Sequence, residues 1–492
     1  MIFAARYMRR LVVLAVVVAA PGVGWHGHPA RAWGNPGDPP GPAMRYAGML
    51  ADGTRVEGRE LNNWAGWSDS PRLDGIELLN ASRPLRWLRD QTLPAFEPGG
   101  NMGGLVELSN GDRLPGRVIE YVQPESGEAG AKPGEAGAKP GEPPHLVVAI
   151  EAPPTAPSEV RLATRVRVLP RWLRRVVWGR VPPGGIEPGT LLFRDGRRLP
   201  YQALRWQRSA VRVLVGQGVQ QVPLAELAEI VFPRDDPWQT YCNELAALNL
   251  DLKGAARLVR IETAEGLIVT TSEGGVKPAG IGGDRANWYH TARPVWSLDQ
   301  VWVRLLSIRL RYYFPPHELP LGRWPPVRYV SRPMLSKGWP WRLDSNVSGG
   351  LLAGAKQAYG WGLGVHAPCE LWFQIPPLAD GFRTRAGLDR LAGDGGCVRA
   401  VVAVNRSDAT PLYRSKHIIG SGEVIDTGTL PLAGPTGGQK DLILVADAAE
   451  TDRPPGADPL DIRDTLDWIE PVFLLNRDKL RAEVAKRAAA RK

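Results

Sequence analysis

Short segments in which apolar and polar residues alternate run along the chain, and turns rich in Gly, Pro and Asp separate them. In the segment FRTRAGLD, residues 382–389, the alternation places one set of side chains on a single face: Phe382, Thr384, Ala386 and Leu388. A period of two residues is typical of a β-strand with one buried face. The 56 glycines and 46 prolines among 492 residues also disfavour long helices. The pattern therefore predicts a mainly β protein.

One short pattern recurs along the first two thirds of the chain. It reads LADGTRVEG from Leu50, LSNGDRLPG from Leu108 and FRDGRRLPY from Phe193, with a degenerate copy, RIETAEGLIVTTSEGG, from Arg260. The central Asp-Gly or Asn-Gly pair favours a two-residue hairpin turn that needs positive φ. We therefore expect tandem small antiparallel β-barrel repeats over residues 44–98, 99–180, 181–235 and 260–320.

Three segments depart from this β pattern. The heptapeptide EAGAKPG occurs twice, at 128–134 and 135–141, and this low complexity predicts a disordered insertion over residues 124–144 of the second repeat. Asp236 as the N-cap and Pro237 at the first helical position predict a helical connector over residues 236–259. Residues 476–492 form a basic segment with a narrow apolar stripe, which predicts a helical tail projecting from the domain.

The first residues have the pattern of an export signal. Arg6, Arg9 and Arg10 precede an apolar run, Leu11–Ala20, and Ala30-Arg31-Ala32 supplies a small-x-small cleavage motif. Residues 1–32 are therefore interpreted as a signal peptide and residues 33–43 as a Pro/Gly linker. We expect a secreted protein or one of the periplasm or cell envelope. No interior run of 18 apolar residues occurs, so the sequence does not predict an integral membrane protein.

The formal net charge of +10 belongs almost entirely to the two ends of the chain. Residues 1–32 carry +4 and residues 476–492 carry +5, which leaves +1 for residues 33–475. A nearly neutral body lacks the excess of positive charge that binding a phosphate backbone needs. Nucleic acid is therefore not an expected partner.

The chain has three cysteines, Cys242, Cys369 and Cys397. Cys369 and Cys397 each open a strand-like segment, and an exported chain permits disulfides. A Cys369–Cys397 bridge on neighbouring strands and three buried free thiols are both open at this stage. No CxxC pair occurs, so the sequence gives no support for a zinc ribbon or a thioredoxin-type site.

From about Leu321 the chain becomes a series of alternating strands that predicts a two-sheet antiparallel sandwich over residues 321–475. This region also resembles the NPCBM family of carbohydrate-binding modules. The resemblance rests on YGWGLGVHAPCELWF (359–373), FRTRAGLDRLAGDGGCVRAVVAVN (382–405), PLYRS (411–415) and DTLDWIEPVFLL (464–475). It implies a galactose-binding-like jelly-roll sandwich and a glycan or cell-surface polysaccharide as partner.

Trp361, His366 and Asp389 are the candidate sugar-binding residues. Trp361 lies between glycines, His366 follows in the same loop and strand, and Asp389 ends another strand, so all three are expected at one rim. A buried His366 and a turn-capping Asp389 are the alternative roles. Trp372, between Leu371 and Phe373, is expected to pack in the core or on a sheet face.

Four acidic residues spaced by three could place oxygens on one side of a turn and hold calcium, or could belong to a solvated loop: Asp458, Asp461, Asp464 and Asp467. The sequence does not decide between the two, and no cofactor is predicted.

No HExxH, GxSxG or Walker motif occurs. We therefore predict an exported, non-catalytic carbohydrate-binding protein. The first alternative is a structural scaffold that binds protein partners through its β-barrel repeats. The second alternative is an accessory part of a glycoside-processing enzyme, although the repeats leave no contiguous segment for a catalytic barrel.

Overall fold

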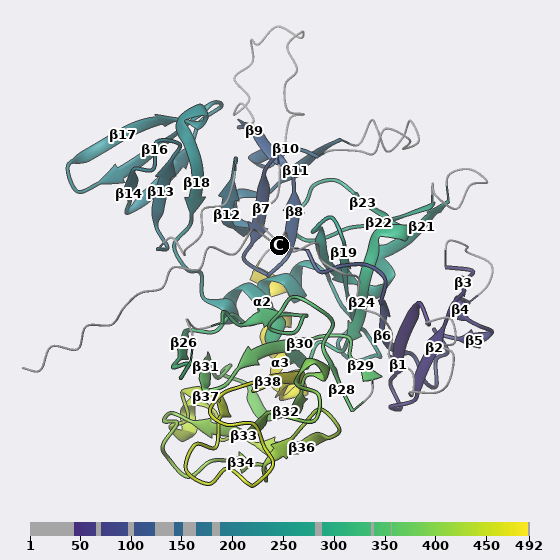
Figure 1. The fold of residues 1–492 in the computed structure, drawn as a ribbon. Helices are drawn as coiled ribbons and strands as arrows, with labels where there is room; N and C mark the ends of the chain where they lie inside the picture. The colour runs from purple at the N-terminus through teal and green to yellow at the C-terminus, as the bar shows by residue number, and fades with distance from the viewer. Residues whose placement is uncertain are drawn as a thin grey trace, which may run out of the picture. The chain divides into compact units, whose positions relative to one another are not determined.

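Strands dominate the computed structural model of the chain (Figure 1). It describes residues 44–64, 70–96, 103–123, 142–150, 164–179, 187–280, 288–335, 339–355 and 357–490. The predicted signal peptide and linker and most of the predicted insertion lie outside these residues and stay predictions. None of the helices in the described ranges is long and apolar enough to cross a membrane.

The first 24 strands follow one order four times: a hairpin, a three-stranded sheet, and a closing strand that pairs with the first strand of its own hairpin. The first repeat consists of β1 (Tyr46–Leu50), β2 (Arg55–Gly58), β3 (Leu61–Asn62), β4 (Arg72–Leu73), β5 (Ile76–Glu77) and β6 (Leu85–Asp90). The second consists of β7 (Leu105–Leu108), β8 (Arg113–Pro115), β9 (Arg117–Val122), β10 (His145–Ala149), β11 (Arg165–Val168) and β12 (Leu173–Val177). The third consists of β13 (Thr190–Phe193), β14 (Arg198–Pro200), β15 (Ala203–Trp206), β16 (Ala210–Val215), β17 (Gly218–Pro223) and β18 (Leu227–Val231). The fourth consists of β19 (Leu258–Thr263), β20 (Ile268–Ser272), β21 (Val276–Gly280), β22 (Trp288–Ala292), β23 (Val301–Arg304) and β24 (Ile308–Phe314).

The four hairpins turn through loops of the same geometry. In the first, the Gly53 amide donates to the Leu50 carbonyl (3.0 Å) and the Leu50 amide donates to the Thr54 carbonyl (2.8 Å). Each hairpin has a glycine with φ between 83° and 93° at the equivalent position: Gly53, Gly111, Gly196 and Gly266. The turn is therefore a three-residue loop ending in a left-handed glycine, and the prediction of a two-residue turn was wrong. The requirement for a glycine with positive φ is the same in both turns.

The four repeats do not close into separate barrels, which corrects the prediction of tandem barrels. Their hairpins and closing strands form one sheet in the order β14-β13-β18-β12-β7-β8-β20-β19-β24-β6-β1-β2. Closing strands join the repeats, because β12 pairs with β18 and β24 pairs with β6. The repeats therefore lie in this sheet in the order third, second, fourth, first.

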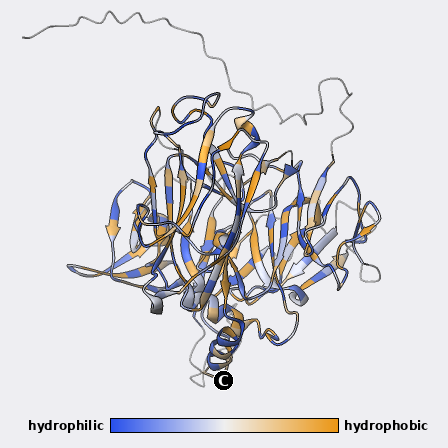
Figure 2. Cartoon of the chain, turned by 90° about the horizontal axis from the view of Figure 1, so that it is seen from below, coloured by the Kyte–Doolittle hydropathy of each residue, from blue (hydrophilic) through white to orange (hydrophobic). Residues whose placement is uncertain are grey.

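The C-terminal part is an antiparallel sandwich of two sheets, in the orders β27-β30-β38-β32-β36 and β26-β31-β37-β33-β34. β25 adds to the first sheet by pairing with β38, and β35 pairs with β33. Its strands are β25 (Glu318–Pro320), β26 (Arg328–Ser331), β27 (Arg342–Leu343), β28 (Ala353–Gly354), β29 (Gln357–Ala358), β30 (Gly362–His366), β31 (Cys369–Gln374), β32 (Ala379–Leu388), β33 (Cys397–Val404), β34 (Tyr413–Arg414), β35 (Ile418–Ile419), β36 (Val424–Pro431), β37 (Asp441–Asp447) and β38 (Thr465–Leu475). Hydrophobic and hydrophilic residues alternate along many strands (Figure 2). The predicted mainly β fold with a C-terminal sandwich is confirmed.

Two α-helices, α2 (Pro237–Ala247) and α3 (Arg477–Ala490), lie in the described part of the chain. Asp236 caps α2 by accepting a hydrogen bond from the Trp238 amide (2.9 Å). The helix ends at Ala247, and residues 258 and 259 of the predicted connector open β19 instead. α3 does not project as expected, because Leu480 and Val484 are buried in one core with α2 and the sandwich.

Candidate functional site

The outer face of the first sandwich sheet is covered by the first repeat. The indole of Trp87 on β6 donates to the Glu470 carboxylate on β38 (2.8 Å), and Arg86 donates to the same carboxylate (2.9 Å). Arg89 donates to the backbone carbonyl of Gly360 (2.9 Å). Since Trp87 and Arg89 are buried, the part of this face that they cover is an internal interface and offers no surface for a ligand.

Trp361 belongs to this interface. Its side chain is only 2% exposed, and its ring stacks on Tyr312 of β24 with the centroids 5.4 Å apart. The neighbouring Gly360 lies directly under Trp87, because a Cβ atom at this position would be 2.5 Å from the indole ring. Trp361 cannot present its ring to a sugar, so its predicted role was wrong. The local sequence could not show this, because Tyr312 and Trp87 come from distant parts of the chain.

The predicted convergence of the three site residues at one rim is also wrong. The Trp361 carbonyl accepts from the Glu470 amide, whereas His366 and Asp389 flank Thr465 on opposite sides of β38. Residues 465 and 470 of a strand are about 16 Å apart. Trp361 therefore lies at the opposite end of β30 from His366, beside the middle of β38, and away from the other two residues.

His366 and Asp389 have different environments. His366 is half-buried, burial lowers its pKa, and its ring stacks on Trp339, which is 42% exposed. Asp389 is only 1% exposed and accepts hydrogen bonds from the Leu391 amide (2.9 Å) and from Asn346 (3.2 Å). Asp389 therefore caps a turn, and only His366 with Trp339 stays near the surface.

Asp389 also hydrogen-bonds to Asp467 in the sandwich interior. Burial raises the pKa of Asp467 well above its usual value, and the negative charge of Asp389 raises it further. Burial raises the pKa of Asp389 as well. Two neighbouring buried carboxyl groups with raised pKa values favour sharing one proton in the folded protein.

The acids of the predicted calcium loop bond to separate partners. Asp458 pairs with Arg463 (2.6 Å), and Asp461 accepts from the Met334 amide (2.8 Å). Asp464 accepts from the Cys397 amide (2.7 Å) and from Arg453 (2.7 Å). Within the described ranges, no three His, Cys, Asp or Glu side chains are grouped as metal ligands would be.

The three cysteines are buried free thiols, so of the two alternatives left open by the sequence the Cys369–Cys397 disulfide is excluded. Cys369 lies on β31 and Cys397 on β33, and β37 runs between these two strands. Two strand spacings, about 9.6 Å, exceed the Cα separation that a disulfide can bridge. Burial raises the pKa of the Cys369 thiol to about 12, so this thiol stays protonated and unreactive at neutral pH.

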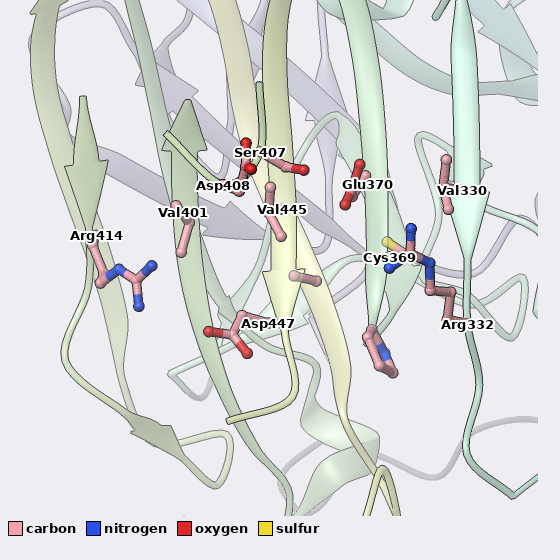
Figure 3. A pocket seen from close by; sticks show the side chains of 12 residues that line it. Val330, Arg332, Cys369, Glu370, Val401, Ser407, Asp408, Arg414, Val445 and Asp447 are labelled. Carbon is pink, nitrogen blue, oxygen red and sulfur yellow. The ribbon is translucent and has the colours of Figure 1, made fainter. Parts of the chain in front are cut away.

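The outer face of the second sandwich sheet carries a pocket of about 240 Å³ (Figure 3). One row of directly paired residues crosses five strands at its floor: Val330, Glu370, Val445, Val401 and Arg414. The rest of the lining comes from strand ends and from the loop after β33: Arg332, Pro368, Cys369, Ser407, Asp408, Ala446 and Asp447. We refer to these twelve residues as the sheet-face pocket.

The carboxylates of the sheet-face pocket form hydrogen bonds or ion pairs, but its two cationic side chains form none with the described residues. Asp408 pairs with Arg406 (2.7 Å), and Asp447 pairs with Arg399 (3.0 Å). Arg332 and Arg414 are exposed and make no side-chain hydrogen bond or ion pair with any residue that the structure describes. In Figure 3 they lie on the two outer strands, with the acidic side chains between them. Their guanidinium groups can therefore donate to a ligand lying across the sheet.

An aromatic ring flanks this pocket. The indole of Trp372 donates to Glu370 (2.9 Å), and the Arg328 guanidinium lies over the ring at 5.0 Å. Trp372 is only half-buried on the outward face of β31, so of its two expected positions it takes the sheet face and not the core. Alternation along β31 does signal this, because Glu370, Trp372 and Gln374 share one face while Leu371 and Phe373 share the other. The neighbouring apolar residues obscured the pattern.

These observations define a mainly β protein with a C-terminal antiparallel sandwich and an open, polar pocket on its outer sheet. Residues 329–473 match the NPCBM/NEW2 domain, which confirms the resemblance seen in the sequence for this part of the chain.

Several solved structures resemble parts of the chain. A CBM51 from Clostridium perfringens GH95 in complex with methyl-galactose is 18% identical, with a TM-score of 0.26, and the match covers 32% of this chain and 99% of that one. The CBM51-2 and INT domains of Clostridium perfringens ZmpB, in complex with GlcNAc, are 16% identical with a TM-score of 0.26, covering 42% of this chain and 43% of that one. CsCBM6-3 from Clostridium stercorarium in complex with cellobiose is 14% identical with a TM-score of 0.16, covering 30% and 94%. No curated protein matches the chain.

Proposed function

We propose that the chain is an exported, non-catalytic protein whose C-terminal sandwich binds a glycan of the cell surface or its surroundings in the sheet-face pocket. The observation that carries this proposal is the pair of unpartnered guanidinium groups, Arg332 and Arg414, on the open face of the region that matches the NPCBM/NEW2 domain. Guanidinium groups donate several hydrogen bonds in one plane, which suits neighbouring sugar hydroxyls.

The same face supplies the other kinds of contact that sugar binding uses. Glu370 and Ser407 provide acceptors at the pocket, and Trp372 flanks it with its ring under the Arg328 guanidinium. The pocket is shallow, so we expect binding in the range of about 1 mM to 1 μM. A non-catalytic role is proposed because the sequence has no HExxH, GxSxG or Walker motif.

The loop end at His366 is the second candidate site. Trp339 presents an exposed ring there, and its stacking on His366 holds the ring in place. One sugar ring could pack on the free side of Trp339. The two candidate sites use different side chains, so variants of Trp339 and of the two arginines distinguish them.

The full chain should first be screened on a glycan array, and the best glycan then titrated by isothermal calorimetry. We expect Arg332→Ala combined with Arg414→Ala to weaken binding roughly tenfold or more, because hydrogen bonds to a charged group contribute about 1.5–3 kcal/mol. Arg234→Ala, an exposed arginine outside the sandwich, is the control and should bind as the wild type does.

Two results would contradict this assignment. If Trp339→Ala abolishes binding while the double arginine variant binds normally, the loop end is the site and the sheet-face pocket is not. If the folded chain binds no glycan at all, the alternative of a scaffold without sugar affinity replaces the proposal.

A further inference from the structure

The three-stranded sheet of the third repeat is cationic and has an exposed edge. Its strands lie in the order β15-β16-β17, so β17 is an edge strand (Figure 1). Residues 203–223, which span the sheet, include Arg205, Arg208 and Arg212 but no aspartate or glutamate. This sheet is separate from the sandwich and from the proposed glycan site.

Two arginines lie side by side on the solvent face of this sheet. Arg205 on β15 and Arg212 on β16 are direct cross-strand partners, and both are exposed. Neither forms an ion pair or side-chain hydrogen bond with a residue in the described ranges. Like charges directly opposite each other destabilise a sheet. The pair therefore creates a local positive potential that an anionic partner would neutralise.

The edge of β17 has free backbone groups at known positions. The Gln207 amide donates to the Ala210 carbonyl, so Ala210 on β16 points its backbone groups toward β15. Because these directions alternate along a strand, Val211 and Val213 of β16 bond to β17 through their partners Val222 and Gln220. The backbone groups of the intervening residues, Val219 and Gln221, consequently point out from the edge.

Apart from Pro223 at its C-terminal end, this edge lacks the features that usually prevent a further strand from adding to a sheet. Proteins protect such edges with charged side chains, prolines or bulges. Residues 218–222 include no charge and no proline, and residues 218–221 are exposed. Val219 is 58% exposed, and Leu214, its partner on β16, is 39% exposed on the same face as Arg212. A strand added at this edge would therefore contact the apolar side chains of Val219 and Leu214 and lie close to the positive charge of Arg212.

We propose that β17 binds an extended, acidic segment of a partner protein by strand addition. The segment pairs with the free backbone groups of Val219 and Gln221, and its alternate acidic side chains extend over Gln221 toward Arg212. A second copy of this chain is a poorer occupant, because it would bring a second cationic sheet to the same edge. A polysaccharide lacks the regularly spaced backbone amides that this edge can pair with.

The probe is a fluorescein-labelled peptide of alternating Val and Glu residues, and its binding to the full chain is followed by fluorescence anisotropy. We expect saturable binding that weakens as salt is added, and no binding of the matched Val/Lys peptide. Gln221→Pro removes one outward amide without breaking a bond to β16, so it should weaken binding at least tenfold. Gln221→Ala keeps that amide and should bind as the wild type does.

Charge reversal tests the second half of the proposal. Arg205→Glu combined with Arg212→Glu should also weaken binding of the Val/Glu peptide at least tenfold, and circular dichroism confirms that each variant is folded. If the charge-reversal variant loses binding but Gln221→Pro does not, strand addition is refuted and the peptide adheres by charge alone. If sedimentation shows that the chain dimerises and Gln221→Pro makes it monomeric, the occupant is a second copy and the proposal is wrong.

Discussion

The buried pair of Asp389 and Asp467 makes the stability of the sandwich depend on pH. Burial raises the pKa of Asp467 well above the ordinary value of 3.8, and the neighbouring charge of Asp389 raises it further. In the unfolded chain Asp467 returns to the ordinary value. Between these two pKa values the folded protein therefore holds a proton that the unfolded chain has lost.

The sign and size of the effect follow from this difference in bound protons. A raised pKa in the folded state gives stability that is fully present below pH 3.8 and is lost as the pH rises toward the folded pKa. One proton corresponds to a slope of up to about 1.4 kcal/mol per pH unit. Between the ordinary value and the raised pKa, the free energy of unfolding that this pair contributes therefore falls as the pH rises.

Asp467→Asn removes this titration while keeping the hydrogen bonds. The new amide donates to Asp389, and its oxygen still accepts from the Ala353 amide, which lies 3.1 Å from Asp467. Urea unfolding followed by tryptophan fluorescence at several pH values gives the free energy of unfolding for both proteins. We expect the variant to gain stability relative to the wild type as the pH rises. Asp394→Asn changes an exposed carboxylate of the same sandwich and is the control.

Only the difference between the two proteins is diagnostic. Burial and the nearby charge of Glu262 raise the pKa of Asp344 to about 8, and this group gives wild type and variant the same slope over the same pH range. If the wild type and Asp467→Asn lose stability in parallel between about pH 5 and about pH 7, the pair does not hold the extra proton and the reasoning fails.

Three further predictions concern the interface and the thiols. Trp361→Ala should lower the free energy of unfolding by about 3–5 kcal/mol in urea titrations, as truncation of a buried aromatic does, and an unchanged urea midpoint would contradict its burial. Gly360→Ala should lower the free energy of unfolding by about 1–3 kcal/mol, because the new methyl group would collide with the Trp87 ring. The same urea titration measures this change, and an unchanged free energy of unfolding would show that Gly360 and Trp87 are not tightly packed. A thiol reagent should label none of the three buried cysteines in the native protein and all three after denaturation. If only one cysteine is labelled after denaturation, the other two form a disulfide and the assignment of three free thiols is wrong.

Local features of the fold were predictable from the sequence because they depend on neighbouring residues. The glycines of the hairpins need positive φ, and Asp236 with Pro237 starts α2 through contacts with its own neighbours. The repeated pattern therefore identified hairpins even in the degenerate copy at Gly266. The order of the repeats in the sheet was not predictable, since it depends on pairings such as that of β24 with β6, between residues far apart in the chain.

The candidate site also depends on residues that are far apart in the chain, and the sequence did not predict it for that reason. A tryptophan between glycines is exposed in an isolated loop, and only packing against Tyr312 and Trp87 buries Trp361. The sheet-face pocket depends on strand register, which brings Glu370 and Arg414 to one level across the second sheet. Spacing within a single segment has no information about such registers.

The order of the repeats has a consequence for how the chain matures during synthesis. The first repeat is synthesised early, but its closing strand β6 pairs with β24, which ends at Phe314 and is synthesised much later. Trp87 of β6 also hydrogen-bonds to Glu470, which lies near the end of the sandwich. Until those residues emerge, the edge of β6 and the ring of Trp87 have no partners from the later segments. Nascent chains that stop short therefore expose a strand edge together with apolar surface, the combination that promotes aggregation and recruits chaperones. The first repeat therefore reaches its final packing only after the C-terminal sandwich has been synthesised.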